Sequence, residues 1–293
     1  MLKLMDDYVV AIDTDSLYIR MDDFCEQRLG KEVWKSKTDK EKVNIIDEIS
    51  ECINDYINEK VYNTVQLEMY NSTVEDFRIK FAKEKIAKSG LFIAKKMYSV
   101  RCLWIEGDYV DKISTTGLTI VRGDSSEAIR YRLKDIMYMI MNDLPEKDIQ
   151  SKISKYKKEL QGVNPEELAA NIGVSHINKW LSKDDKAIKR TPWHVKGAIN
   201  YRHLLETLKL EDKYEEITEG MKVKVVYIKA NPYNMETISF YKWPKEFEEV
   251  IQVDKEKMIE KFFLNKVGIL LEPMNKLYMI SLESEEALDL FFS

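Results

Sequence analysis

The sequence predicts an α+β fold in two domains, and three observations support this prediction. Stretches that favour strands and stretches that favour helices are segregated along the chain and do not strictly alternate. The chain has 293 residues and is 44% hydrophobic, so it can bury a sizeable core and is long enough for roughly two domains. It holds only 10 glycines and 6 prolines, which indicates ordinary globular elements and not linkers.

The first 118 residues combine a hairpin, helices and a long strand. Residues 8–20 form two β-rich runs around an acidic centre, which predicts a hairpin with its polar tip at Asp13 to Ser16. Thr38 can cap a helix whose apolar residues recur at intervals of three and four. A second amphipathic helix, one long strand and a closing hairpin turn are expected at residues 67–77, 91–104 and 106–108.

Beyond Gly117 the pattern becomes mainly helical. A helix is expected over residues 125–141, and Pro145 and Pro165 each lie near the start of another helix. Two short strands follow, at residues 223–228 and 237–240. We therefore expect a domain boundary near residues 118–124.

Charge is distributed unevenly, although the net charge is −5. The window from Arg78 to Arg101 carries eight basic residues against Glu84 alone, and residues 179–202 carry seven basic residues against two acidic ones. Acidic residues gather at 206–219. The two basic windows could face a polyanion, but each taken alone could equally be a solvated surface.

The cysteines and the hydropathy pattern bear on the compartment. The three cysteines lack C-x-x-C spacing, so neither a disulfide framework nor a zinc site is implied, and we expect a reducing cytoplasm. No stretch approaches the ~20 apolar residues of a membrane span, and the first residues carry charges where a signal peptide needs an apolar run. A soluble protein without a membrane partner is expected.

Asp13 and Asp15 form the candidate metal-binding pair. On an extended strand their side chains would share a face, and near a hairpin tip they could converge on a hard cation such as Mg²⁺. A D-x-D sequence also occurs in sugar-nucleotide transferases and in ordinary turns. An EF-hand is excluded because no third ligand and no loop glycine follow at the required spacing.

Residues 13–16 (DTDS) lie between two apolar runs, and residues 92–98 read FIAKKMY. The first segment resembles motif C of family B DNA polymerases, particularly those of tailed bacteriophages, and the second resembles the family's K-K-R-Y motif. Residues 117–124 (GLTIVRGD) are similar to its G-L-E-x-V-R stretch, and residues 191–198 (TPWHVKGA) are similar to a thumb segment of phage polymerases. The order and spacing of the four segments fit, and they cover nearly the whole chain.

The resemblance implies an architecture and roles for particular residues. Residues 1–118 would be the C-terminal half of a palm, an antiparallel hairpin with helices, and residues 119–280 a mostly helical thumb with a small β subregion. Asp15 would be the principal metal ligand and Asp13 its partner, with Mg²⁺ in a two-metal site. The residues expected to contact primer-template DNA are Lys95, Lys96 and Tyr98 in the palm and Arg122, His194 and Lys196 in the thumb. Tyr98 could instead be a strand residue packed on the palm, and the three thumb residues could be solvated. His176 and His203 are expected to be structural.

The sequence departs from the family pattern in ways that affect function. Ile12 stands where a small residue is usual, and Met97 and Thr119 replace the usual Arg and Glu. Only 12 residues precede Asp13, and neither motif A, motif B nor an exonuclease domain is found. We therefore expect the isolated chain to be inactive and to need an N-terminal polymerase fragment that supplies a further metal ligand and binds the dNTP.

The last 13 residues, 281–293, resemble a sliding-clamp-binding tail. One helical turn would place Leu288, Phe291 and Phe292 on one side, as an apolar plug for a pocket on the clamp. Docking of the same side chains onto the thumb is the ordinary alternative.

The sequence thus predicts the C-terminal portion or subunit of a DNA-directed DNA polymerase, a nucleotidyltransferase of DNA replication, acting in the host cytoplasm if the protein is viral. The rival is a truncated polymerase that acts as a noncatalytic DNA-binding and clamp-tethering module, in which the two aspartates are relics. A D-x-D glycosyltransferase ranks far behind, because the chain lacks a nucleotide-binding βαβ unit.

Overall fold

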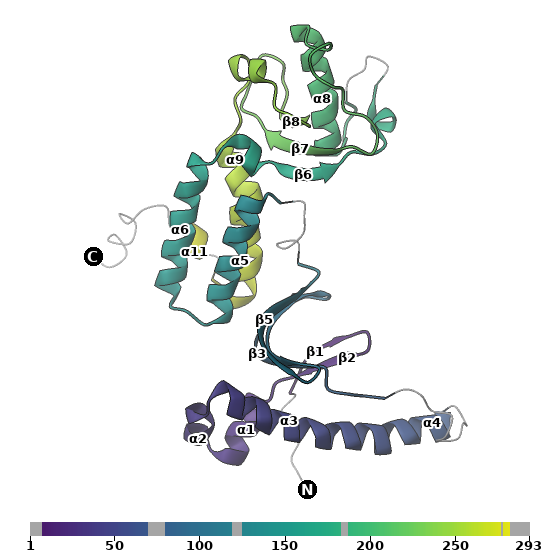
Figure 1. The fold of residues 1–293 in the computed structure, drawn as a ribbon, viewed down its shortest axis with the longest axis vertical. Helices are drawn as coiled ribbons and strands as arrows, with labels where there is room; N and C mark the ends of the chain where they lie inside the picture. The colour runs from purple at the N-terminus through teal and green to yellow at the C-terminus, as the bar shows by residue number, and fades with distance from the viewer. Residues whose placement is uncertain (1–7, 70–79, 119–124, 183–186, 277, 282–293) are drawn as a thin grey trace. The chain divides into compact units, whose positions relative to one another are not determined.

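The structure is a computed structural model, and it describes residues 8–69, 80–118, 125–182, 187–276 and 278–281. The chain divides into two compact units, residues 1–117 and residues 118–293. The α+β class predicted from the sequence is confirmed: small antiparallel sheets and separate groups of helices make up the described parts (Figure 1). Each unit is described by itself.

The first unit begins with the predicted hairpin. Strand β1 (Val9–Asp13) pairs antiparallel with β2 (Ser16–Ile19), and Asp13 lies opposite Ser16 at the tip. Short helices α1 (Asp22–Leu29) and α2 (Lys31–Ser36) follow, and the buried Trp34 donates its indole N–H to Asp22 at 2.9 Å.

Helix α3 (Asp39–Tyr56) starts where the sequence predicts it. The Thr38 hydroxyl accepts from the backbone N–H of Glu41, and the Glu41 carboxylate accepts from the N–H of Thr38 at 2.8 Å, which completes a capping box. The helix continues through a π-helical segment, Ile57–Tyr62, into α4 (Asn63–Met69). The helix expected over residues 67–77 is thus seen only at its start, and its remainder lies outside the described residues.

A three-stranded antiparallel sheet completes the first unit. Its order is β3 (Lys85–Ala94), β4 (Met97–Ile105) and β5 (Asp108–Thr116), and α3 packs against β3 and β4. The turn expected at residues 106–108 is confirmed. The single long strand expected over residues 91–104 is wrong, because Lys95 and Lys96 form a tight turn in which Lys96 takes a φ of 59°.

The second unit combines helices with a second three-stranded sheet. Helices α5 (Glu127–Met141) and α6 (Glu146–Gly162) lie side by side, and α7 (Pro165–Leu168) leads into the sheet (Figure 1). The sheet has the order β6 (Ala170–Gly173), β7 (Lys222–Tyr227) and β8 (Thr237–Phe240). The predicted helix over residues 125–141, the helix starts near Pro145 and Pro165 and the two predicted strands are confirmed.

The remaining elements of the second unit cover its sheet and join its helices. Helix α8 (Trp193–Leu208) packs on β8, after the 3₁₀ turn Ile177–Trp180. A 3₁₀ turn at Lys245–Glu249 precedes α9 (Lys255–Ile259), a π-helical segment at Glu260–Leu264 and α10 (Asn265–Leu271). A 3₁₀ turn at Glu272–Met274 and α11 (Tyr278–Ser281) end the described chain.

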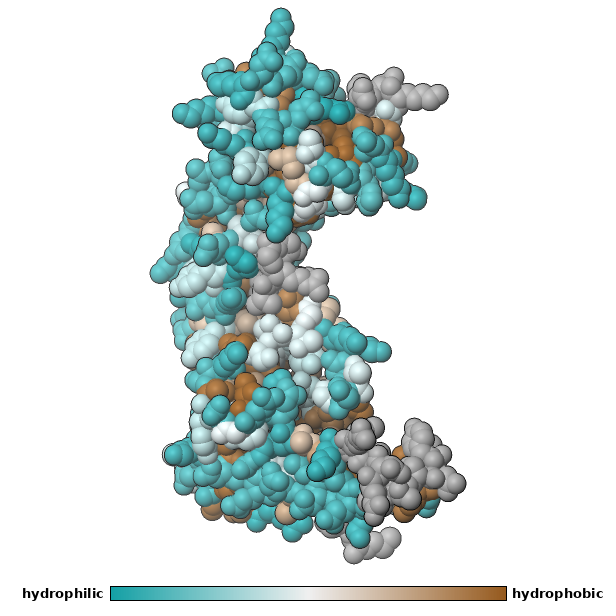
Figure 2. Space-filling model, turned by 45° about the vertical axis from the view of Figure 1, so that its right-hand side comes forward, coloured by the Kyte–Doolittle hydropathy of each residue, from teal (hydrophilic) through white to brown (hydrophobic). Residues whose placement is uncertain are grey.

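Polar residues cover most of the visible surface, with smaller hydrophobic areas between them (Figure 2). Within the described ranges, no helix is long and apolar enough to cross a bilayer.

Candidate metal and nucleic-acid site

The two aspartates lie at the tip of the first hairpin. Asp13 ends β1 and is half-buried, whereas Asp15 is exposed in the turn. The turn is closed by the Ser16 hydroxyl, which donates to the Asp13 carbonyl oxygen at 3.0 Å. Thr14, between the aspartates, has a φ of 58°, a left-handed conformation that β-branched residues rarely adopt.

A tyrosine from the three-stranded sheet reaches this tip. The Tyr98 hydroxyl donates to Asp13 Oδ2 at 3.2 Å, although the two residues are 85 positions apart. The Tyr18 hydroxyl in turn donates to the Tyr98 hydroxyl at 3.2 Å. The hairpin and the sheet are therefore joined by a chain of hydrogen bonds that ends on one of the predicted metal ligands.

Three aromatic rings hold these hydroxyls in place. The ring of Tyr18 packs edge-on against the rings of Phe92 and Tyr98, with centroids 5.3 Å away in both cases. Phe92 and Tyr98 stack on each other at 5.5 Å. Tyr98 is only 9% exposed, so its hydroxyl acts inside the fold. Burial, and then the hydrogen bond to Tyr98, raise the pKa of Tyr18, which keeps its proton at neutral pH.

Lys95 and Lys96 form the turn between β3 and β4, and both side chains are exposed. Gly117 lies against the backbone of this turn, because a Cβ atom added to it would come within 1.7 Å of the Lys96 carbonyl oxygen. Its φ of 67° also favours glycine. Tyr98 lies two residues after Lys96, so the same turn connects the exposed lysines to the aspartate pair.

Most of the other basic residues in the first basic window are neutralised by nearby carboxylates. Lys88 pairs with Asp39 at 2.7 Å, and Arg101 pairs with Asp111 at 2.7 Å, which lowers the pKa of the Asp111 carboxyl. Lys83 pairs with Asp47 and Glu51, and Lys85 pairs with Glu84. By contrast, Lys95 and Lys96 make no ion pair with any residue that the structure describes. Their charges remain available to an outside partner.

The aspartate pair offers the right chemistry for Mg²⁺ but an incomplete set of ligands. Carboxylate oxygens are the protein ligands that this hard cation prefers. Among the residues whose placement is described, however, no group of three or more histidines, cysteines, aspartates or glutamates could hold a metal ion. Asp13 and Asp15 alone would therefore supply only part of a metal site.

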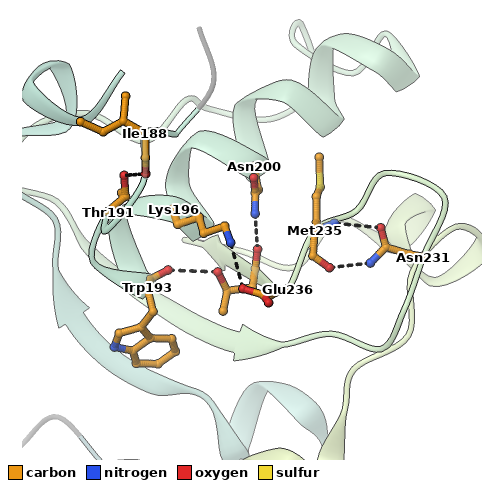
Figure 3. A network of polar contacts seen from close by, with 9 residues as sticks. Ile188, Thr191, Trp193, Lys196, Asn200, Asn231, Met235 and Glu236 are labelled. Atoms are coloured by element: carbon orange, nitrogen blue, oxygen red, sulfur yellow. Dashed lines mark hydrogen bonds and ion pairs between the residues drawn. The ribbon is translucent and has the colours of Figure 1, made fainter. Parts of the chain in front are cut away.

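In the second unit, the segment 191–198 is fixed to strand β8 through its backbone. The Thr237 hydroxyl donates to the Trp193 carbonyl oxygen at 3.0 Å, and the Asn200 amide donates to the Thr237 carbonyl oxygen at 2.8 Å (Figure 3). The Ser239 hydroxyl donates to the His194 carbonyl oxygen at 2.7 Å. These bonds attach the first turn of α8 to the sheet.

The two candidate DNA contacts on this segment are in different environments. Lys196 pairs with Glu236 at 2.9 Å, which lowers the pKa of the Glu236 carboxyl (Figure 3). His194 is half-buried, and burial lowers its pKa. Its Nδ1 atom is buried without a hydrogen-bond partner in the part of the chain that the structure describes.

Arg122, Leu288, Phe291 and Phe292 lie outside the described residues. His176 and His203 are exposed, and each lies near a glutamate, Glu219 and Glu206 respectively.

Two curated proteins resemble the chain. Over 305 residues it is 22% identical to the DNA-directed DNA polymerase of Enterobacteria phage T4, and the match covers 98% of this chain. Over 151 residues, or 49% of the chain, it is 32% identical to the DNA polymerase of Thermococcus gorgonarius. No protein-family model matches the chain.

The two matches support the resemblance to family B DNA polymerases. The chain is much shorter than the polymerases that it matches, because the matches span 32% of the phage polymerase and 15% of the Thermococcus polymerase. The similarity to the phage polymerase extends over both units, so it includes the hairpin tip as well as the segment at the start of α8.

Sequence reasoning missed two residues of the site, Tyr18 and Phe92. The alternation along β2 places Tyr18 on the same face as Ser16, but nothing local indicates that its partner is Tyr98, 80 positions later. The signal that could have found them is position, because Tyr18 lies two residues after the DTDS segment and Phe92 is the first residue of the FIAKKMY segment.

Proposed function

We propose that this chain is the C-terminal portion or subunit of a DNA-directed DNA polymerase, and that its hairpin tip supplies part of the catalytic metal site. The observation that carries the proposal is the hydrogen bond from Tyr98 to Asp13. It connects the segment that resembles motif C with the segment that resembles the K-K-R-Y motif. Similarity to a phage polymerase along 98% of the chain supports the same conclusion.

Asp15 and Asp13 are the residues that would hold Mg²⁺ in this proposal. When bound, the metal would lower the pKa of the primer hydroxyl and stabilise the charge on the leaving pyrophosphate. The chain's own contribution is to present two carboxylates at a fixed turn, with Asp15 exposed and Asp13 held by Tyr98. Further carboxylates and the residues that bind the dNTP would come from an N-terminal polymerase fragment.

The exposed turn at Lys95 and Lys96 would contact the primer-template backbone. Ammonium groups neutralise phosphates without reading bases, as a polymerase that copies every sequence requires. Tyr98, expected from the sequence to join them, turns its hydroxyl to Asp13, and its role is developed in the next section. The second unit would act as the thumb, with Arg122, His194 and Lys196 near the backbone, and the tail residues Leu288, Phe291 and Phe292 would bind a sliding clamp.

A DNA-binding assay tests the role of the turn. The double variant Lys95→Ala/Lys96→Ala should weaken binding of primer-template DNA, and the slope of log K against log salt should decrease by about 2, since each phosphate contact contributes roughly 0.9. The matched control is Lys31→Ala/Lys35→Ala, which removes the same charge from exposed positions of α2. Equal slopes for the two variants would show that the turn does not contact DNA.

Primer extension tests catalysis and separates the proposal from its rival. The chain is mixed with a polypeptide that carries the remaining polymerase motifs, and extension is compared for the unaltered chain and Asp15→Ala. Loss of extension with retained DNA binding supports a catalytic role. If Asp15→Ala still supports full extension, the chain is a tether and not a contributor to the metal site.

A truncation tests the tail. Deletion of residues 288–293 should remove the gain in processivity that a sliding clamp provides, while synthesis in the absence of the clamp stays the same. An unchanged response to the clamp would reject this part of the proposal.

A further inference from the structure

The hydrogen bonds at the hairpin tip have a direction that the chemistry of their groups imposes. An ionised carboxylate can only accept hydrogen bonds, so the single proton of the Tyr98 hydroxyl must point to Asp13. The oxygen of that hydroxyl is then free to accept, and the Tyr18 hydroxyl is the group that donates to it. The order is therefore Tyr18 to Tyr98 to Asp13.

We propose that Tyr18 is a positioning residue that acts through Tyr98 to fix the orientation of the Asp13 carboxylate in the metal site. This inference rests on the proposed function, because it concerns the same pair of aspartates. It goes further by assigning Tyr18 and Tyr98 to the support of a ligand and not to the binding of DNA.

The surroundings of the two tyrosines fit this role. A phenol hydroxyl can rotate about its C–O bond, and a second hydrogen bond to its oxygen restricts that rotation. The ring positions are themselves restrained by mutual packing with Phe92, at 5.3 to 5.5 Å between centroids. Because Tyr98 is only 9% exposed, water has little access to compete for its hydroxyl.

The opposite side of the carboxylate is restrained as well. The Thr14 hydroxyl donates to Asp13 Oδ1 at a long 3.4 Å, while Tyr98 donates to Oδ2. Each oxygen of Asp13 thus has a contact, which leaves Asp15 as the more open ligand. Groups that orient a metal ligand commonly change metal affinity by about 10-fold or more when they are removed.

Mn²⁺ binding to the full-length chain tests the inference without any activity assay. Mn²⁺ broadens the amide NMR signals of nearby residues, so titration of the ¹⁵N-labelled chain gives an affinity at residues 13–16. Tyr98→Phe should weaken this affinity about 10-fold. Tyr18→Phe should weaken it less, by roughly 3-fold, because it acts only by strengthening and orienting the Tyr98 bond.

Two further variants make the result specific. The double variant Tyr18→Phe/Tyr98→Phe should bind Mn²⁺ no more weakly than Tyr98→Phe alone, since the effect of Tyr18 passes through Tyr98. Tyr109→Phe removes a hydroxyl that contacts Asn44 elsewhere in the same unit, and it should leave the Mn²⁺ affinity unchanged.

The outcomes separate this inference from the proposed function. If Asp13→Asn and Asp15→Asn leave the broadening unchanged, the metal site itself is wrong. If these variants abolish it while Tyr18→Phe binds Mn²⁺ as tightly as the unaltered chain, only the positioning role is overturned. The positioning role would also be overturned if the losses of Mn²⁺ affinity in the two single variants added up in the double variant. A loss of Mn²⁺ affinity in Tyr109→Phe as large as that in Tyr18→Phe would overturn it as well.

Discussion

Replacement of Gly197 by alanine should destabilise the second unit, because α8 lies very close to β8 at this residue. A Cβ atom at position 197 would lie 2.5 Å from Ser239 Oγ, 2.8 Å from Ser239 N and 3.0 Å from the Ile238 carbonyl carbon. The Ser239 side chain can rotate, at the loss of its bond to the His194 carbonyl oxygen, but the two backbone atoms cannot move without shifting the strand.

The magnitude follows from three contributions to the free energy of unfolding. Overpacking costs about 1–3 kcal/mol, and the lost hydrogen bond costs about 1 kcal/mol. Alanine returns about 1 kcal/mol through its higher helix propensity. We therefore expect Gly197→Ala to lower the free energy of unfolding by about 1–3 kcal/mol.

Gly162→Ala is the matched control for this prediction. Gly162 is also helical, but no atom lies within 4 Å of its added Cβ, so only the favourable propensity remains. We expect urea unfolding, followed by circular dichroism and by tryptophan fluorescence, to give Gly197→Ala a lower free energy of unfolding than the unaltered chain. Gly162→Ala should have a free energy of unfolding equal to or above that of the unaltered chain. If Gly197→Ala proves as stable as Gly162→Ala, the close approach of α8 to β8 is wrong.

Three further perturbations follow from the structure. Gly117→Ala should destabilise the first unit by about 2 kcal/mol or more, because the added Cβ meets the Lys96 carbonyl oxygen and the position requires a positive φ. Gly107→Ala has open space around its added Cβ, so it should lower the free energy of unfolding less in the same urea assay. Thr38→Ala removes the cap of α3 and should lower stability by about 1 kcal/mol, seen as faster amide exchange in the first helical turn; unchanged exchange would count against the capping box. Because burial lowers the pKa of His194 below its ordinary 6.5, the unfolded chain binds a proton more readily, so stability is complete above pH 6.5 and decreases as the pH falls below it. His194→Phe should flatten that part of the pH profile of unfolding, and an unaltered profile would assign the acid sensitivity to another group.

Local signals predicted much of the fold. The capping residue Thr38 marks a helix start that the structure confirms, and the two β-rich runs on either side of Asp13 predicted the first hairpin correctly. These signals succeed because the residues that create them contact residues nearby in the sequence.

The turn at Lys95 and Lys96 shows where local signals fail. Strand-favouring residues continue on both sides, and two lysines are as compatible with an exposed strand face as with a turn. What fixes the turn is the packing of Gly117 against the Lys96 carbonyl oxygen, from a residue 21 positions later. No pattern within the strand could reveal it.

The two aspartates of the candidate site could be singled out from the sequence, but the residues that contact them could not. The motif-like spacing identified Asp13 and Asp15, yet the contact between Asp13 and Tyr98 joins residues 85 positions apart. Charge counting likewise indicated a basic window without showing that Lys88 and Arg101 are paired with carboxylates from elsewhere in the chain. Ion pairs between distant residues depend on the folded geometry, which a count along the sequence does not contain.

The left-handed conformation of Thr14, between the two aspartates, lowers the stability of this hairpin but keeps a hydroxyl beside Asp13. A β-branched residue with a φ of 58° carries an energetic cost of about 1–3 kcal/mol, which a glycine or asparagine would largely avoid. Engineering for heat tolerance alone would therefore begin at Thr14. The same change would remove the hydroxyl that contacts Asp13, so under the proposed function a gain in melting temperature would come with weaker binding of the metal ion.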